Sequence, residues 1–359
     1  MRSSTGLYVS KLDHVRAAAA FLVYCWHFVH VQVPFNTVPA FPPLSLLEEG
    51  HIGVALFMTL SGYLFAKIVD GRQLDLARFY RNRLLRLAPL LAVVLSYWAL
   101  RGDMGLQSFL EGFFLPTWHG GAWSIAVELH FYALFPAILW LQRGNRIGAL
   151  VALFMASILM RFGVWAATGS VQAFSYWTIG GCIDLFLAGM LWHELSKLDA
   201  VRRRAGAMCI TALLTTIAAW HVFNLAGGFE ETAPSPLWII IPTLQGLLLG
   251  AVIVGYEHCR VTLPGRADRA LAKVGEVSYS IYLLHFVFYP TIVKQLAAAG
   301  FDMASFPMAL AFAALSFPFI VGIAMLSFRF IEQPFLKLRG NYERRPYPAM
   351  PASSFTSGA

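Results

Sequence analysis

The first long apolar stretch of the chain carries charged and titratable side chains that membrane-spanning helices usually avoid. It reads LDHVRAAAAFLVYCWHFVH, residues 12–30. Arg16 and His27 are eleven residues apart, a spacing that returns an α-helix to within about 20° of the same face after a rise of about 16 Å. One face therefore presents a cation near one end and an imidazole deeper inside, with Asp13 on the same side. Burying such groups is costly, so we expect them to face a cavity or a partner.

These residues also have structural interpretations. Arg16 could anchor the helix at a basic membrane side, and His27 could only hydrogen-bond a neighbouring helix. His27 and His30 could ligate a metal, but two histidines without an acidic partner nearby are weak evidence for one. We therefore predict no metal site.

An arginine-rich segment, RFYRNRLLRLAP at residues 78–89, leads into a later apolar stretch. Arg83 and Arg86 are three residues apart and share a helix face. Paired guanidinium groups suit a phosphate-bearing ligand, because their planar fork matches phosphate oxygens. The alternative is a topology anchor whose long side chains reach back to the membrane surface.

Three further segments place polar groups inside apolar stretches. In HGGAWSIAVELHFYALFP, residues 119–136, the spacing of Ser124, Glu128 and Tyr132 predicts one helix side, with Trp123 at its mouth. A carboxylate there should face the bundle interior, although a polar network that only locks helices together is an alternative. VSYSIYLLHFVFYP contains Ser280 and His285, and FIEQPFLKL places Glu332 where the last apolar stretch ends.

The composition predicts a membrane protein. Of the 359 residues, 58% are hydrophobic and 13% are charged, whereas a soluble domain usually has about 25% charged residues. Mean hydropathy is +0.63. The net charge of +8 is typical of basic cytoplasmic loops, so we expect a lipid bilayer and no nucleic acid as partner.

About ten apolar stretches have the length of a helical span. Inside a bilayer, the backbone can form all its hydrogen bonds only in helices or in a closed barrel of strands. The predicted fold class is an all-α polytopic bundle with spans at 13–32, 51–68, 86–101, 123–141, 147–165, 177–195, 206–223, 237–255, 276–296 and 306–328.

The basic residues predict the orientation. If the N-terminus is cytoplasmic, 24 of the 27 Lys and Arg residues fall on that side, as the positive-inside rule requires. The exceptions are Arg101, Arg161 and Lys294. Both termini are therefore predicted to be cytoplasmic.

The domain prediction is one membrane domain, residues 1–340, with a disordered Pro/Ser/Ala-rich tail at 341–359. We find no cleavable signal and expect no appended soluble domain. The four cysteines show no CxxC spacing and are interpreted as small core residues.

Five blocks, in order, resemble the acyltransferase 3 family of integral membrane acyltransferases, over about residues 12 to 337. They are LDHVRAAAAFLVYCWHF; LFMTLSGYLFA, which contains Leu60, Ser61 and Gly62; FYRNRLLRLAPL; AWSIAVELHFYALFP; and VSYSIYLLHF with the closing EQPF. Where many members have Val-Glu-Glu-Gln-Phe-Tyr, this chain has Leu129 and His130 at the third and fourth positions. The second carboxylate is missing, and so is the esterase-like domain that some members carry, so we expect the chain to act alone.

The resemblance implies transfer of an acyl group, commonly acetyl, from cytosolic acyl-CoA to an acceptor hydroxyl, often on a lipid-linked glycan or exported polysaccharide. Acetyl-CoA would be a co-substrate with no permanently bound cofactor, and the enzyme would lie in the cell inner (plasma) membrane. The donor phosphates would lie on Arg16, Arg83 and Arg86. His27 would be the general base, with Glu128 as orienter or second acid/base. The predicted supporting residues are Asp13, Ser61, Trp123, Ser124, Tyr132, His285 and Glu332.

Alternatives remain open at this point. A covalent acyl-histidine relay would use the same residues. The acceptor could be a secreted small molecule such as a glycosylated antibiotic. A proton-coupled transporter also needs buried His, Glu and Arg, although we find no paired inverted repeat. A scaffold without enzymatic activity should lack this buried ionisable set.

Overall fold

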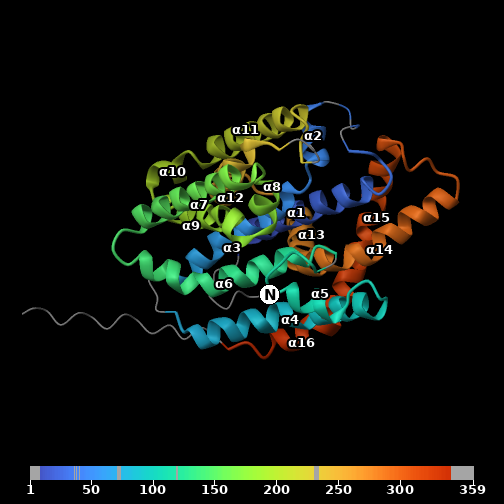
Figure 1. Ribbon diagram of the computed structural model, residues 1–359, viewed down its shortest axis with the longest axis horizontal. Coiled ribbons are helices and arrows are strands. Elements are labelled where there is room, and N and C mark those ends of the chain that lie inside the picture. Colours follow the sequence, from blue (N-terminus) through green and yellow to red (C-terminus); the bar gives the residue numbers. More distant parts are fainter. Residues whose placement is uncertain are drawn as a thin grey trace, which may run out of the picture.

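A computed structural model describes residues 9–35, 37, 39, 41–70, 74–118, 120–229 and 234–340. Within these ranges the chain is a bundle of helices without strands (Figure 1), which confirms the predicted all-α membrane fold. The long helices are α1 (Ser10–Val29), α3 (Ile52–Val69), α4 (Leu76–Leu100), α6 (Trp123–Leu141), α7 (Arg146–Thr168), α9 (Ile179–Leu195), α11 (Ala205–Leu225), α12 (Ile241–His258), α14 (Ser278–Ala298) and α15 (Phe306–Ser327).

Shorter helices connect or flank the long ones. They are α2 (Pro42–Glu48), α5 (Leu106–Glu111), α8 (Gln172–Trp177), α10 (Asp199–Arg203), the 3₁₀ turn η1 (Pro236–Ile239), α13 (Gly265–Glu276), the π-helical turn η2 (Phe328–Glu332) and α16 (Gln333–Leu336). The tail predicted to be disordered, residues 341–359, lies outside the described residues.

A long helix lies at each of the ten predicted spans. Seven helical segments of the described chain are long and apolar enough to cross a membrane: α3, α4, α6, α7, α11, α14 and the continuous segment Phe306–Leu336. The other three predicted spans coincide with α1, α9 and α12, which have 20, 17 and 18 residues. The total of ten spans and the cytoplasmic location of both termini stay predictions.

Helix α4 begins earlier than the predicted span, at Leu76 instead of residue 86. Asp75 caps it, because its side chain accepts a hydrogen bond from the backbone nitrogen of Arg78 at 3.1 Å. The arginine-rich segment is therefore already helical. This places Arg83 and Arg86 on one rigid element and fixes the spacing of their side chains.

Helix α1 packs against α3, α13, α14 and α15 (Figure 1). The end of α13 approaches it closely at Gly275, where an added Cβ would lie 1.9 Å from the carbonyl oxygen of Asp13. Only glycine fits there without displacing backbone. This contact places Glu276 next to the charged start of α1.

Arg161, one of the three exceptions to the charge rule, is a buried structural residue of α7. Its guanidinium donates to the Ile239 and Gly181 carbonyls, each at 2.7 Å, and to Asp184 at 2.8 Å. Ser157 and Thr243 accept the remaining N–H groups at 3.1 and 2.7 Å. All five donors of the guanidinium are thus used. The residue is therefore satisfied inside the helix bundle and does not have to lie in a loop exposed to water.

The tight contact between α3 and α9 generates a prediction about stability. A Cβ on Gly62 would lie 2.0 Å from the Phe186 carbonyl oxygen, and one on Gly189 would lie 2.0 Å from that of Thr59. We expect Gly62→Ala to lower the free energy of unfolding by about 1–3 kcal/mol, because backbone cannot yield as a side chain can. Thermal unfolding of the purified protein in detergent measures the effect.

Gly163→Ala is the matched control. Gly163 is an exposed position of α7 with no atom within 4 Å of an added Cβ. Its replacement should be neutral or stabilising by up to about 1 kcal/mol, from helix propensity alone. Equal unfolding temperatures for the two variants would contradict the packing described for α3 and α9.

Candidate active site

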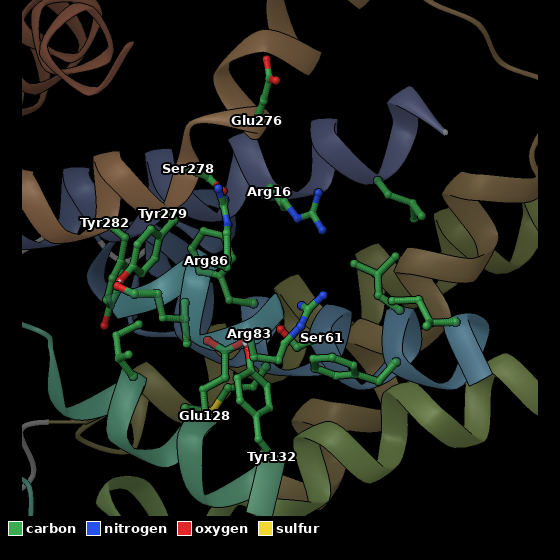
Figure 2. Close-up of a pocket in the computed structure, with 18 of the residues that line it drawn as sticks. Arg16, Ser61, Arg83, Arg86, Glu128, Tyr132, Glu276, Ser278, Tyr279 and Tyr282 are labelled. Atoms are coloured by element: carbon green, nitrogen blue, oxygen red, sulfur yellow. Dashed lines mark hydrogen bonds between the residues drawn. The ribbon is translucent and has the colours of Figure 1, made fainter. Parts of the chain in front are cut away.

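A cavity of about 590 Å³ lies between α1, α3, α4, α6, α14 and the C-terminal helical end (Figure 2). It brings together eight of the twelve residues predicted from the sequence. These lining residues are Asp13, Arg16, Ser61, Arg83, Arg86, Ser124, Glu128 and Tyr132. Segments far apart along the chain, from Val9 to Gly340, therefore contribute to one space.

The mouth of the cavity is basic. Figure 2 shows the guanidinium groups of Arg16 and Arg83 extending into the open centre from opposite sides. Arg16 also donates to Asp13, one turn earlier on α1, and the Arg83 guanidinium lies over the Phe65 ring at 5.1 Å. Six basic and three acidic side chains line the cavity, so the space suits an anionic ligand.

Glu332 positions Arg86 instead of lining the cavity. Its side chain is 0% exposed and lies 3.2 Å from the Arg86 guanidinium, and it accepts a hydrogen bond from the Ser280 hydroxyl. A carboxylate that the protein shields from solvent needs such partners. The segments containing Ser280 and Glu332, which are 52 residues apart, therefore act together on one arginine.

The inner end of the cavity is polar. The Tyr132 hydroxyl donates to Glu128 one turn away at 2.5 Å, and charge attraction links Glu128 to Arg83, Arg86 and Arg16. Ser124, one turn in the other direction, also reaches the cavity. The predicted face of α6 is thus the face that lines the space.

Tyr282 closes this inner end. The Ser124 hydroxyl donates to the Tyr282 hydroxyl at 2.8 Å, and Tyr282 donates to the Gly121 carbonyl at 3.0 Å. Gly121 has φ +72°, and a Cβ there would lie 2.3 Å from the Phe286 ring. A glycine is therefore required for the backbone to approach α14 this closely.

His27 and His285 form a pair beyond Tyr282 and do not line the cavity. His27 Nδ1 lies 2.8 Å from the Val23 carbonyl oxygen and 3.3 Å from His285 Nε2. A carbonyl only accepts, so His27 carries its proton on Nδ1. His285 Nδ1 likewise donates to the Ile281 carbonyl at 3.0 Å. The Nε2 lone pair of His27 is consequently available to a reacting group.

Trp123 lies apart from the cavity. Its ring packs against Trp177 and Tyr176, with centroids 4.5 and 5.0 Å apart. It is therefore placed with the aromatic groups at the opposite end of α6 from the basic mouth.

Several lining residues were not predicted from the sequence. Lys67, Lys337 and Arg339 were interpreted only as topology anchors, and Tyr282 is three residues from His285 in a motif where it resembles a core aromatic. Glu276 was not singled out. Burial acts to raise its pKa, but the hydrogen bond from Lys273 is among the effects that hold the pKa below its usual range. Its carboxylate is thus charged at neutral pH.

Comparisons with known proteins show what the chain is similar to. A family model for an acyltransferase domain matches residues 9–327. Nodulation protein 10 of Rhizobium leguminosarum bv. viciae is 26% identical over 79% of this chain and 84% of its own length. The exopolysaccharide production protein ExoZ of Rhizobium meliloti is 26% identical over 70% of this chain and 80% of its own. No solved structure shows a significant match.

The peptidoglycan O-acetyltransferase OatA of Listeria monocytogenes is also 26% identical, over 79% of this chain but only 49% of its own length. The helical bundle and the matched domain define a membrane-bound acyltransferase. The chain belongs to the acyltransferase 3 family. This membership supports an O-acyltransferase over the transporter and the scaffold considered above.

The ion pair between Arg86 and Glu332 generates the second prediction. Arg86→Ala should lower the free energy of unfolding by about 1–3 kcal/mol, because it leaves a buried carboxylate without its cation. The Arg86 side chain is 22% exposed, so solvent screening keeps the loss below that of a fully buried pair. Adding Glu332→Gln should restore part of the stability.

Arg78→Ala is the control on the same helix. Arg78 forms an exposed pair with Asp75 at 3.2 Å, which should contribute less than about 1 kcal/mol. Unfolding in detergent of the wild type, Arg86→Ala, Glu332→Gln and the double variant completes a double-mutant cycle. Additive losses for Arg86→Ala and Glu332→Gln would show that the two side chains do not stabilise each other.

Proposed function

We propose that the enzyme transfers an acetyl group from cytosolic acetyl-CoA to a hydroxyl group of a glycan acceptor, at the inner (plasma) membrane. The observation that carries this proposal is the cavity, with a basic mouth at one end and a polar inner end next to His27. The names of the relatives, which include an O-acetyltransferase and an exopolysaccharide production protein, support the acyl group and the acceptor class.

The mouth suits the nucleotide end of coenzyme A. Its phosphates would lie on Arg16, Arg83 and Arg86, whose side chains meet in the cavity. Guanidinium groups bind phosphate oxygens with paired, charge-assisted hydrogen bonds. The pantetheine arm is thin and has a length similar to the rise from Arg16 to His27, so it would extend toward the inner end of the cavity.

The reaction needs a base for the acceptor hydroxyl. His27 Nε2 would take the hydroxyl proton while the oxygen attacks the thioester carbonyl carbon. The new C–O bond forms, the C–S bond breaks, and the proton passes to the departing thiolate. Ser124 would donate a hydrogen bond to the oxyanion, and Glu128 would orient the reacting groups or act as second acid/base.

Tyr282 and Phe286 separate the thioester from His27 in this conformation. The Phe286 ring centroid lies 4.5 Å from that of His27 and 6.3 Å from that of Tyr282. Transfer therefore requires these two side chains to change rotamer. A covalent relay through His27 would need the same movement, because the thioester must reach the same Nε2 atom.

The donor site can be tested at Arg83. Arg83→Ala should raise the dissociation constant for acetyl-CoA by a factor equivalent to about 1.5–3 kcal/mol, the cost of a charge-assisted contact. Arg83→Lys should recover only part of the affinity, because lysine lacks the planar fork. Stabilisation of the purified protein by acetyl-CoA in a thermal-shift titration measures the affinity.

Arg101→Ala provides the comparison. Arg101 is an exposed residue at the other end of α4, so its removal should leave donor affinity unchanged. An unaltered affinity in folded Arg83→Ala would instead favour the topology-anchor interpretation of the arginine-rich segment.

The base can be tested at His27. His27→Gln preserves size and hydrogen bonding but cannot take a proton near neutral pH, so transfer should fall by about 10²–10⁴-fold. Binding of acetyl-CoA should persist. Release of coenzyme A and acetylation of the acceptor would both be followed.

His130→Gln is the control, since many family members have glutamine at the matching position of the pattern that the sequence resembles. It should keep nearly full activity. If His27→Gln keeps activity within about tenfold of the wild type, general-base catalysis by His27 is excluded. A loss that small lies below the range expected when a general base is removed.

A further inference from the structure

Trp26 is the centre of a second group of polar and aromatic side chains, on the opposite side of His27 from the basic mouth. The members of this group, here the Trp26 cluster, are Trp26, His30, Phe35, Glu48, Glu49, His51, Tyr176 and Phe229. The Trp26 ring centroid lies 4.7 Å from that of His27, 6.5 Å from His30 and 6.0 Å from His51. One indole thus touches the proposed base and both neighbouring histidines.

Several polar atoms of the cluster are buried without a hydrogen-bond partner. They are Trp26 Nε1, His30 Nε2 and both ring nitrogens of His51. Of these, His30 Nε2 lies 3.7 Å from Glu48 Oε2 and His51 Nδ1 lies 3.4 Å from Glu49 Oε2, so a protonated ring would form an ion pair there. The His30 and His51 side chains are only 4% and 1% exposed. Each such atom costs about 1–3 kcal/mol, and buried polar groups are normally paired. Trp26 Nε1 and His51 Nε2 have neither a hydrogen-bond nor an ionic partner among the described residues, and a ligand would supply one.

The orientation of His30 narrows the chemistry of that ligand. His30 Nδ1 donates to the Val33 carbonyl at 3.1 Å, so Nε2 of the neutral ring is an acceptor. It faces Glu48 Oε2 at 3.7 Å, which is also an acceptor. A hydroxyl group would donate a hydrogen bond to His30 Nε2.

The unpaired atoms of Trp26 and His51 include hydrogen-bond donors. The indole N–H of Trp26 only donates, and a neutral His51 ring offers one donor and one acceptor. A hydroxyl group both donates and accepts, so it matches this mixed set. A phosphate, which only accepts, would meet the carboxylates of Glu48 and Glu49 and no lysine or arginine of the cluster. A hydrocarbon chain would leave every polar atom unsatisfied.

The aromatic members are accessible where the polar ones are not. Trp26, Phe35, Tyr176 and Phe229 are each half-buried, and Phe35 stacks on His30 with centroids 4.1 Å apart. Glu49 holds this arrangement by accepting from the Phe229 backbone nitrogen at 3.2 Å. Flat apolar rings beside mixed donors and acceptors suit a ligand that has both a C–H face and hydroxyl groups.

We propose that the Trp26 cluster binds the sugar ring that accepts the acyl group, with one ring hydroxyl directed at His27. The assignment rests on the proposed function, because it gives that reaction its second substrate. His27 then lies between two sites: the cavity supplies the thioester from one side, and the cluster presents a neutral polyhydroxylated ring from the other.

The test uses the full-length protein in detergent and surface and lipid-linked glycans from a strain that lacks the gene. Quenching of tryptophan fluorescence reports glycan binding without the donor, and transfer of label from [¹⁴C]acetyl-CoA reports the reaction. His51→Leu in both assays, and Trp26→Phe in the transfer assay, should each raise the half-saturating glycan concentration by about tenfold or more, equivalent to roughly 1.4 kcal/mol. Stabilisation by acetyl-CoA should stay within about twofold of the wild type.

Matched controls come from the same chain. Trp165→Phe removes another indole whose buried Nε1 has no partner, and His193→Leu removes another buried histidine, 3.5 Å from Asp70. Both should bind glycan like the wild type. The assignment is overturned if the half-saturating glycan concentration rises equally in the controls and the cluster variants. It is also overturned if no glycan quenches the fluorescence of the wild type. Glycan binding without label transfer overturns only the proposed reaction, and transfer with unchanged half-saturation in both cluster variants overturns only this site.

Discussion

The buried ion pair between Arg86 and Glu332 is the contact on which the cavity depends. It joins α4 to the end of the last long helix, and Ser280 of α14 completes it through the same carboxylate. Much of α4 is exposed, so apolar packing alone gives it few partners inside the bundle. A guanidinium directed into a water-accessible space and a carboxylate without solvent satisfy each other only in this arrangement. The pair therefore determines both the position of the helix and the direction of one phosphate-binding group.

The same constraint separates the protein into two chemical environments. Charged groups collect at the cavity mouth, where water reaches them, whereas His27 lies deeper and uses one ring nitrogen to bond its own helix. A neutral imidazole of this tautomer has a lone pair on Nε2 and can accept a proton there. Tyr282 and Phe286 divide these environments, and in the proposed reaction they would keep the thioester away from water and acceptor until both are in place.

Helix positions and most of the cavity lining could be predicted because spacing and burial cost act locally. Apolar length located all ten long helices, and the spacing of Ser124, Glu128 and Tyr132 located the polar face of α6. Contacts between distant segments could not be read this way: Glu332 was predicted as a supporting residue, but nothing in its neighbourhood identifies Arg86 as its partner. Tyr282 and Trp26 were missed for a related reason. An aromatic residue in an apolar helix looks the same whether it packs in the core or borders a site.

Arg161 shows what this bundle does with a buried polar group whose role is structural. All five of its N–H donors are used, by acceptors from α7, α9, η1 and α12. The fold is thus able to satisfy even a fully buried guanidinium. The Trp26 cluster, in the same bundle, leaves Trp26 Nε1 and His51 Nε2 buried with neither a hydrogen bond nor an ionic partner among the described residues. A protein gains stability by pairing or replacing such atoms, so the sugar proposed above would add stability beside His27 when its hydroxyl groups pair with them.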